Sequence, residues 1–145
     1  MKLLMLVLSL LTSVSVFAAQ SYPLFEGAPA AKLYSALQGS PVLSTGPNKV
    51  LNFSNDHSML LCDLQQCSVA FSSFKPSLST DGDILLQVKG IDADLLAAAI
   101  PSFPKNGDLE LGHVGQYGSA YLYCTTGEKE KICTFGINYC YQPGC

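Results

Sequence analysis

The sequence contains no arginine, so its eight basic residues are all lysine. Seven of these lysines and eleven acidic residues follow the first 18 positions, which gives the rest of the chain a formal charge of −4. Nucleic-acid binding needs clustered positive charge, and base recognition relies on the arginine fork. We therefore expect no nucleic-acid partner, and anionic membrane surfaces are disfavoured for the same reason.

The chain also lacks an apolar run long enough to cross a membrane. After Lys2, the run from Leu3 to Phe17 provides 15 residues, whereas a transmembrane helix needs roughly 20. Val16 and Ala18 are the small residues expected three and one positions before a signal-peptidase cut. The pattern predicts a signal peptide over 1–18. It also predicts a single domain over 19–145, secreted or periplasmic, with no transmembrane segment after signal removal.

The sequence also contains no CxxC motif. Six cysteines follow the signal, and an even number in an exported chain indicates disulfides. Without CxxC, neither a structural zinc knuckle nor a redox-active thiol is indicated, and we expect no metal and no cofactor. Of the fifteen possible connectivities, the spacing favours three close pairs. These are Cys62 with Cys67, Cys124 with Cys133, and Cys140 with Cys145.

Two stretches of the chain share a helical pattern. EGAPAAKLYSALQ at 26–38 aligns with KGIDADLLAAAIP at 89–101 when Gly27 is placed on Gly90. Apolar residues then recur in both stretches at spacings of three and four, which predicts a helix with one buried stripe. The expected boundaries are Pro29 and Gly39 for the first helix, and Asp92 as N-cap and Pro101 for the second.

The correspondence continues beyond the helices. Cys62 ends SMLLC and Cys124 ends SAYLYC, and each is followed by a turn and a second strand that begins with cysteine. These segments predict two β-hairpins. If Cys62 faces Cys67 and Cys124 faces Cys133, both disulfides lie on the apolar face of their hairpin and hold its register.

Further strand-like segments complete the pattern. They lie at 21–27 and 83–90 before the helices, and at 49–54 and 108–114 between helix and hairpin. We therefore predict an α+β domain made of an internally duplicated strand-helix-β-meander unit, at about 21–74 and 83–137. It would have a mostly antiparallel sheet with two short helices on one face, or two related layers, and disulfide-stapled hairpins.

The remaining segments are expected to connect or close this fold. SSFKPSLSTDGD at 72–83 is rich in Ser, Pro and Gly, which predicts a linker between the two units. CYQPGC at 140–145 contains a Pro-Gly turn that would bring Cys145 back to Cys140. We expect 138–145 to form a terminal disulfide clasp.

Two histidines are the candidates for a catalytic base. His57 lies in NDHS, where adjacent residues cannot align as nucleophile, base and orienting group, and a polar turn explains the segment. His113 lies in LGHVGQYG, which has neither the glycine spacing nor the lysine of a phosphate-binding loop. Neither segment therefore defines a catalytic site.

Tyrosines in the last third of the chain are the candidate binding residues: Tyr117, Tyr121, Tyr123, Tyr139 and Tyr141. Tyrosine combines a large rigid ring with a polar end, which suits contact surfaces, although the rings could equally cover the sheet. We favour a non-enzymatic binding or interaction module with a protein or other envelope component as partner. The alternative is a small secreted hydrolase or toxin that uses His113 or His57.

Overall fold

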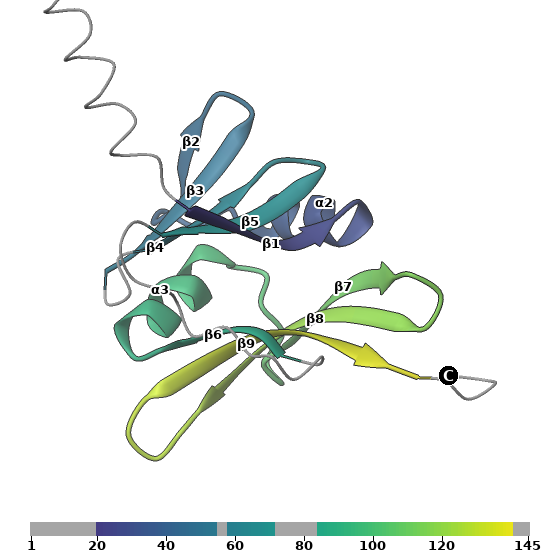
Figure 1. Cartoon of the computed structure of the whole chain (residues 1–145). Helices are drawn as coiled ribbons and strands as arrows, with labels where there is room; N and C mark the ends of the chain where they lie inside the picture. The colour runs from purple at the N-terminus through teal and green to yellow at the C-terminus, as the bar shows by residue number, and fades with distance from the viewer. Residues whose placement is uncertain (1–19, 55–57, 72–83, 141–145) are drawn as a thin grey trace, which may run out of the picture.

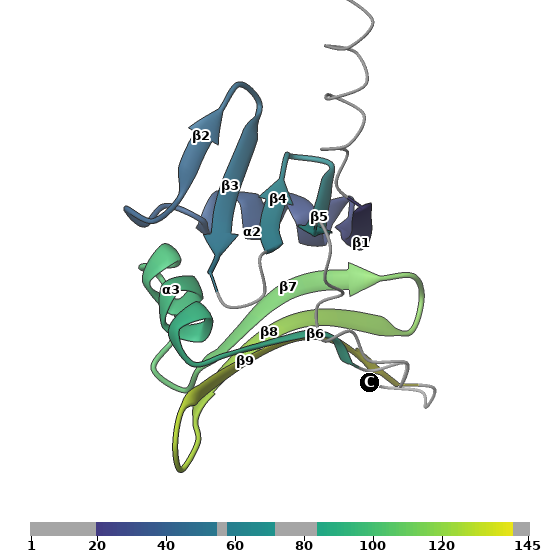
Figure 2. The same ribbon diagram turned by 60° about the vertical axis from the view of Figure 1, so that its left-hand side comes forward.

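The computed structural model describes residues 20–54, 58–71 and 84–140, which form nine strands and two helices (Figures 1 and 2). The first part of the chain contains β1 (Gln20–Glu26), α2 (Ala28–Ala36), β2 (Leu43–Thr45), β3 (Asn48–Phe53), β4 (Ser58–Cys62) and β5 (Gln66–Phe71). The second part contains β6 (Ile84–Lys89), α3 (Ile91–Ala99), β7 (Asp108–Val114), β8 (Gly118–Thr126) and β9 (Lys131–Tyr139). The expected signal peptide and the expected linker at 72–83 lie outside the described residues.

The strands form two antiparallel sheets. The five-stranded sheet has the order β1-β5-β4-β3-β2, and the four-stranded sheet has the order β6-β9-β8-β7. In each sheet, the strand that precedes the helix pairs with the last strand of the meander. The α+β class with antiparallel sheets and two short helices is thus confirmed. The short strand β2, whose three residues are all exposed, was not predicted.

Each helix begins directly after a glycine with positive φ. Gly27 has a φ of 71° and Gly90 a φ of 62°, a region that residues with a side chain rarely adopt. The N–H of Gly27 donates to the carbonyl of Gln65 at 2.8 Å, and the N–H of Gly90 donates to the carbonyl of Lys131 at 2.9 Å. The start of each helix is therefore bonded to the hairpin that follows it in the chain.

The predicted N-cap of the second helix is wrong. Gly90 occupies that position, because the turn out of β6 needs a positive φ, and Asp92 lies within the first turn of α3. The predicted end of the first helix is also displaced. α2 ends at Ala36, with Leu37 as its C-cap, and so stops short of Gly39.

Gly39 is instead a point of close contact between the two parts of the chain. Its N–H donates to the carbonyl of Ala99 at 2.9 Å, and the N–H of Gln38 donates to the same oxygen at 3.0 Å. A Cβ atom on Gly39 would overlap the carbonyl oxygen of Ala98. The segment after α2 therefore satisfies a free carbonyl at the end of α3.

Disulfides join the last two strands of each meander. Cys62 is bonded to Cys67 between β4 and β5, and Cys124 to Cys133 between β8 and β9. These are two of the three predicted pairs, in the predicted register. Cys140 is also disulfide-bonded, whereas its predicted partner Cys145 lies outside the described residues.

The two sheets share one core. Their inner faces and the buried sides of both helices form a continuous apolar cluster, within which the rings of Phe25 and Phe135 lie 6.2 Å apart. α2 packs against β7 of the four-stranded sheet, and α3 packs against β3 of the five-stranded sheet. Figure 2 shows the five-stranded sheet stacked above the four-stranded one. One face of each sheet is thereby left on the outside of the molecule.

Candidate functional site

The outer face of the four-stranded sheet presents two of the candidate tyrosines. Residues alternate between faces along a strand, so Tyr121 and Tyr123 point outward where Ala120 and Leu122 of β8 are buried. Tyr121 lies opposite Gly136 of β9, which has no side chain to cover the ring. Tyr123 is 41% exposed. The two tyrosines are therefore neighbours on one open surface.

Polar groups flank these rings on the neighbouring strands. On β7, Asp108 lies opposite Tyr123 and Glu110 lies opposite Tyr121, and both carboxylates are exposed. On the other side, Thr134 of β9 lies opposite Tyr123 and accepts a hydrogen bond of 3.2 Å from the Gln87 side chain. The surface thus combines aromatic rings, neutral hydrogen-bonding groups and two negative charges along one edge. We call Tyr121, Tyr123, Thr134, Asp108 and Glu110 the tyrosine face.

The other candidate tyrosines lie elsewhere. Tyr117 is in the turn between β7 and β8, and Tyr139 is at the end of β9, opposite Gly118. Both are exposed, and the N–H of Cys140 donates to the carbonyl of Tyr117 at 2.9 Å. They form a second group at the far end of the sheet. Tyr141 lies outside the described residues.

Among the described residues, His113 is not part of a catalytic arrangement. His113 lies on β7 opposite Ser119, exposed on the same outer face as the tyrosines. Within 20–54, 58–71 and 84–140, no hydrogen bond joins its ring to a hydroxyl or a carboxylate. His57 lies outside the described residues.

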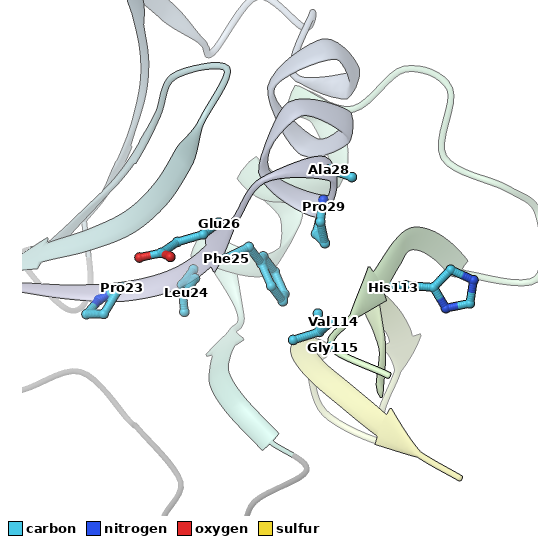
Figure 3. Close-up of a pocket in the computed structure, with 9 residues that line it drawn as sticks. All are labelled: Pro23, Leu24, Phe25, Glu26, Ala28, Pro29, His113, Val114 and Gly115. Atoms are coloured by element: carbon cyan, nitrogen blue, oxygen red, sulfur yellow. The ribbon is translucent and has the colours of Figure 1, made fainter. Parts of the chain in front are cut away.

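A hollow of about 360 Å³ opens between β1, the start of α2 and the end of β7 (Figure 3). Figure 3 shows Phe25, Pro29 and Val114 around it, while the side chains of Glu26 and His113 project away. Its volume is in the range of ligand pockets, but the nearby ionisable groups point out of it. Its walls therefore combine apolar side chains with a similar amount of polar surface.

The position of α3 that corresponds to Pro29 has a buried polar residue. Two residues after its cap glycine, α3 has the buried carboxylate of Asp92, which accepts a hydrogen bond of 2.9 Å from the N–H of Ser54. Two residues after its own cap glycine, α2 has Pro29, which lines the hollow. Sequence reasoning missed this contact because Ser54 and Asp92 are 38 positions apart.

Sequence reasoning also missed Leu64, which is exposed at the tip of the β4–β5 turn and lines a second hollow. An apolar residue within the polar, disulfide-closed segment CDLQQC is the signal that could have identified it.

In the described part of the chain, no helix is long and apolar enough to cross a membrane. The same residues contain no group of three or more His, Cys, Asp or Glu side chains that could hold a metal ion. No protein-family model, curated protein sequence or solved structure matches this chain.

Proposed function

We propose that this chain is a small exported binding module, without catalytic activity, that contacts a protein or another envelope component through its tyrosine face. The observation that supports this most directly is the pair Tyr121 and Tyr123, adjacent on a sheet face that lies opposite the shared core. Tyrosine rings contribute large contact area at low cost in conformational entropy.

The four edge strands of the two sheets are poorly suited to pairing with a strand of a partner, which favours binding through a sheet face. β1 contains Pro23 and an irregularity beside it, and β2 has only three residues. β6 and β7 each contain a shift of register, between Ile84 and Leu86 and between Glu110 and Gly112. Prolines, bulges and short edges are the features that block strand addition.

The charges of the tyrosine face indicate the kind of partner. Asp108 and Glu110 border the rings on one side, and no lysine lies directly opposite either tyrosine. A complementary surface would place hydrogen-bond donors or basic groups against the β7 edge, with an apolar or aromatic centre over the rings.

Export is the second part of the proposal. The N-terminal sequence has the pattern of a signal peptide, and the two disulfides fit a small extracellular or periplasmic protein. Reducing compartments of the cell do not maintain such bonds in most proteins.

Internal duplication is the third part. Both units have the order strand, helix and meander, a positive-φ glycine before the helix, and a disulfide between the last two strands. The Sγ of Cys67 lies 3.6 Å from the carbonyl of Ala30, and the Sγ of Cys133 lies 3.6 Å from that of Ala93. This repeated detail supports two copies of one ancestral unit with separate surfaces.

Affinity capture tests the binding function. The processed chain would be immobilised and exposed to the exported fraction of its own host, beside the variants Tyr121→Ser/Tyr123→Ser and Tyr139→Ser. We expect a partner that the wild type and Tyr139→Ser retain and the double variant loses. Retention by the double variant, or equal loss with Tyr139→Ser, would show that the tyrosine face is not the binding surface.

A further inference from the structure

The molecule contains two equivalent contacts between a helix and a strand of the other sheet: α3 packs against β3, and α2 packs against β7. In the first contact, Ser54 directly follows β3, and Asp92 lies two residues after the cap glycine of α3. In the second, Gly115 directly follows β7, and Pro29 lies two residues after the cap glycine of α2. Gly115 therefore corresponds to Ser54, and Pro29 corresponds to Asp92.

A carboxylate fills the first of these contacts. The side chain of Asp92, which is 1% exposed, accepts a hydrogen bond of 2.9 Å from the N–H of Ser54. It lies in the first turn of α3, where the helix favours negative charge. The protein itself thus provides an example of the chemical group that this arrangement binds.

The second contact has the same surroundings without the carboxylate. The first turn of α2 contains no acidic residue, and no side chain caps it. Among the described residues, the N–H of Gly115 has no hydrogen-bond acceptor. Gly115 and Pro29 instead line the hollow of about 360 Å³. A hydrogen-bond donor and an open space are therefore present where the other contact has its carboxylate.

The remaining walls of the hollow indicate the size and character of a ligand. Phe25 and Val114 give it an apolar side (Figure 3). The carboxylate of Glu26 projects away from the hollow and belongs to an exposed residue, so solvent screens its charge. The volume is at the small end of the range of ligand pockets. The hollow therefore suits a small molecule with one carboxylate and an apolar body.

We infer that this hollow binds a small organic acid. Its carboxylate would accept a hydrogen bond from the N–H of Gly115 beside the start of α2, as Asp92 does from Ser54 beside the start of α3. Its apolar body would lie against Phe25 and Val114. The site is separate from the tyrosine face, so the inference does not depend on the function proposed for that face.

Titration of the isotope-labelled processed chain at pH 7, followed by NMR, tests the site. The probes are 3-phenylpropanoate, which carries a carboxylate on an apolar body, and its neutral analogue 3-phenylpropanamide. A ligand of about eleven non-hydrogen atoms is expected to bind with a Kd on the order of 1 mM. We expect saturable amide shifts at Gly115 and Ala28 with the acid. The amide should bind about tenfold more weakly, because hydrogen bonds to a charged acceptor are stronger.

Two substitutions in the first turn of α2 provide a matched pair. Pro29→Asp supplies a carboxylate from the chain at the position that Asp92 has in α3. This variant should lose the saturable shifts, and its Gly115 amide should already resemble that of the liganded wild type. Ala31→Asp adds the same charge at the position that corresponds to the exposed Asp94, and its Kd should stay within about threefold of the wild-type value.

Melting temperatures would verify that both variants fold, and the comparison of acid and amide on the wild type tests the inference without them. Equal binding of acid and amide would overturn the inference. So would an acid whose shifts do not saturate, or saturable shifts that avoid Gly115 and Ala28. Binding retained by Pro29→Asp would overturn it as well, and so would equal loss in Ala31→Asp, because net charge alone would then explain the effect.

Discussion

Asp92, whose side chain is 1% exposed, accepts hydrogen bonds from the backbone N–H and the hydroxyl of Ser54 at 2.9 and 3.4 Å. The contact joins the end of β3 in the five-stranded sheet to the first turn of α3 on the four-stranded sheet. A carboxylate at this position also interacts favourably with the positive end of the helix. The two parts of the chain are therefore connected by a polar contact as well as by their common core.

Replacing Asp92 by Ala should lower the free energy of unfolding by about 1–3 kcal/mol, because the N–H of Ser54 loses its partner in a partly buried site. Denaturant unfolding with the disulfides intact measures this change. Asp94→Ala is the control: Asp94 is in the same first turn but exposed, 3.8 Å from Lys131, and should change stability by less than about 1 kcal/mol. Equal effects of the two substitutions would contradict the role given to Asp92.

Gly39→Ala should also destabilise the protein, by about 1–3 kcal/mol, because the added Cβ would overlap the carbonyl of Ala98 and force the backbones apart. Thermal unfolding of the variant measures the loss. An unchanged melting temperature would show that the segment after α2 does not lie closely against α3.

Several elements of the fold could be predicted from the sequence because their signals are local. The helices follow from the spacing of Ala30 and Leu33 in one unit and Ala93 and Leu96 in the other. The hairpins follow from the paired cysteines. In contrast, β2 has three exposed residues and no alternation of buried and exposed positions, so its sequence contains no strand pattern.

The contacts between the two units could not be predicted. Asp92 has the local features of an N-cap, and only its distant partner Ser54 explains its place in the first turn. Gly39 has the local features of a helix end, whereas its role depends on the position of α3. For the candidate site, alternation along β8 placed Tyr121 and Tyr123 together, but the acidic edge depends on the pairing of β7. Such long-range pairings have no local signal.

The glycines before the helices test the proposed duplication. Gly27 has φ 71° and ψ −136°, and Gly90 has φ 62° and ψ −129°. Ala at either position would strain the backbone. We expect each substitution to lower the free energy of unfolding by about 1–3 kcal/mol, and the two losses to be similar. Equilibrium unfolding of the two single variants gives the comparison. Full tolerance at one position and a large loss at the other would contradict equivalent roles.

The terminal clasp remains a prediction, since Cys145 lies outside the described residues. Replacing both Cys140 and Cys145 by Ser should remove about 2 kcal/mol, which for a domain of this length lowers the melting temperature by about 8 °C. Binding to the partner should persist. A double variant that melts like the wild type but no longer binds would instead indicate a redox-sensitive functional bond.

Photo-crosslinking in the native host tests the central proposal most directly. A photoreactive phenylalanine analogue would replace Tyr123 on the tyrosine face or, as the matched control, Leu43, which is similarly exposed on the five-stranded sheet. After irradiation, we expect a discrete crosslinked partner from position 123 and none of that mass from position 43. A partner crosslinked from position 43 alone, with none from position 123, would contradict binding through the tyrosine face.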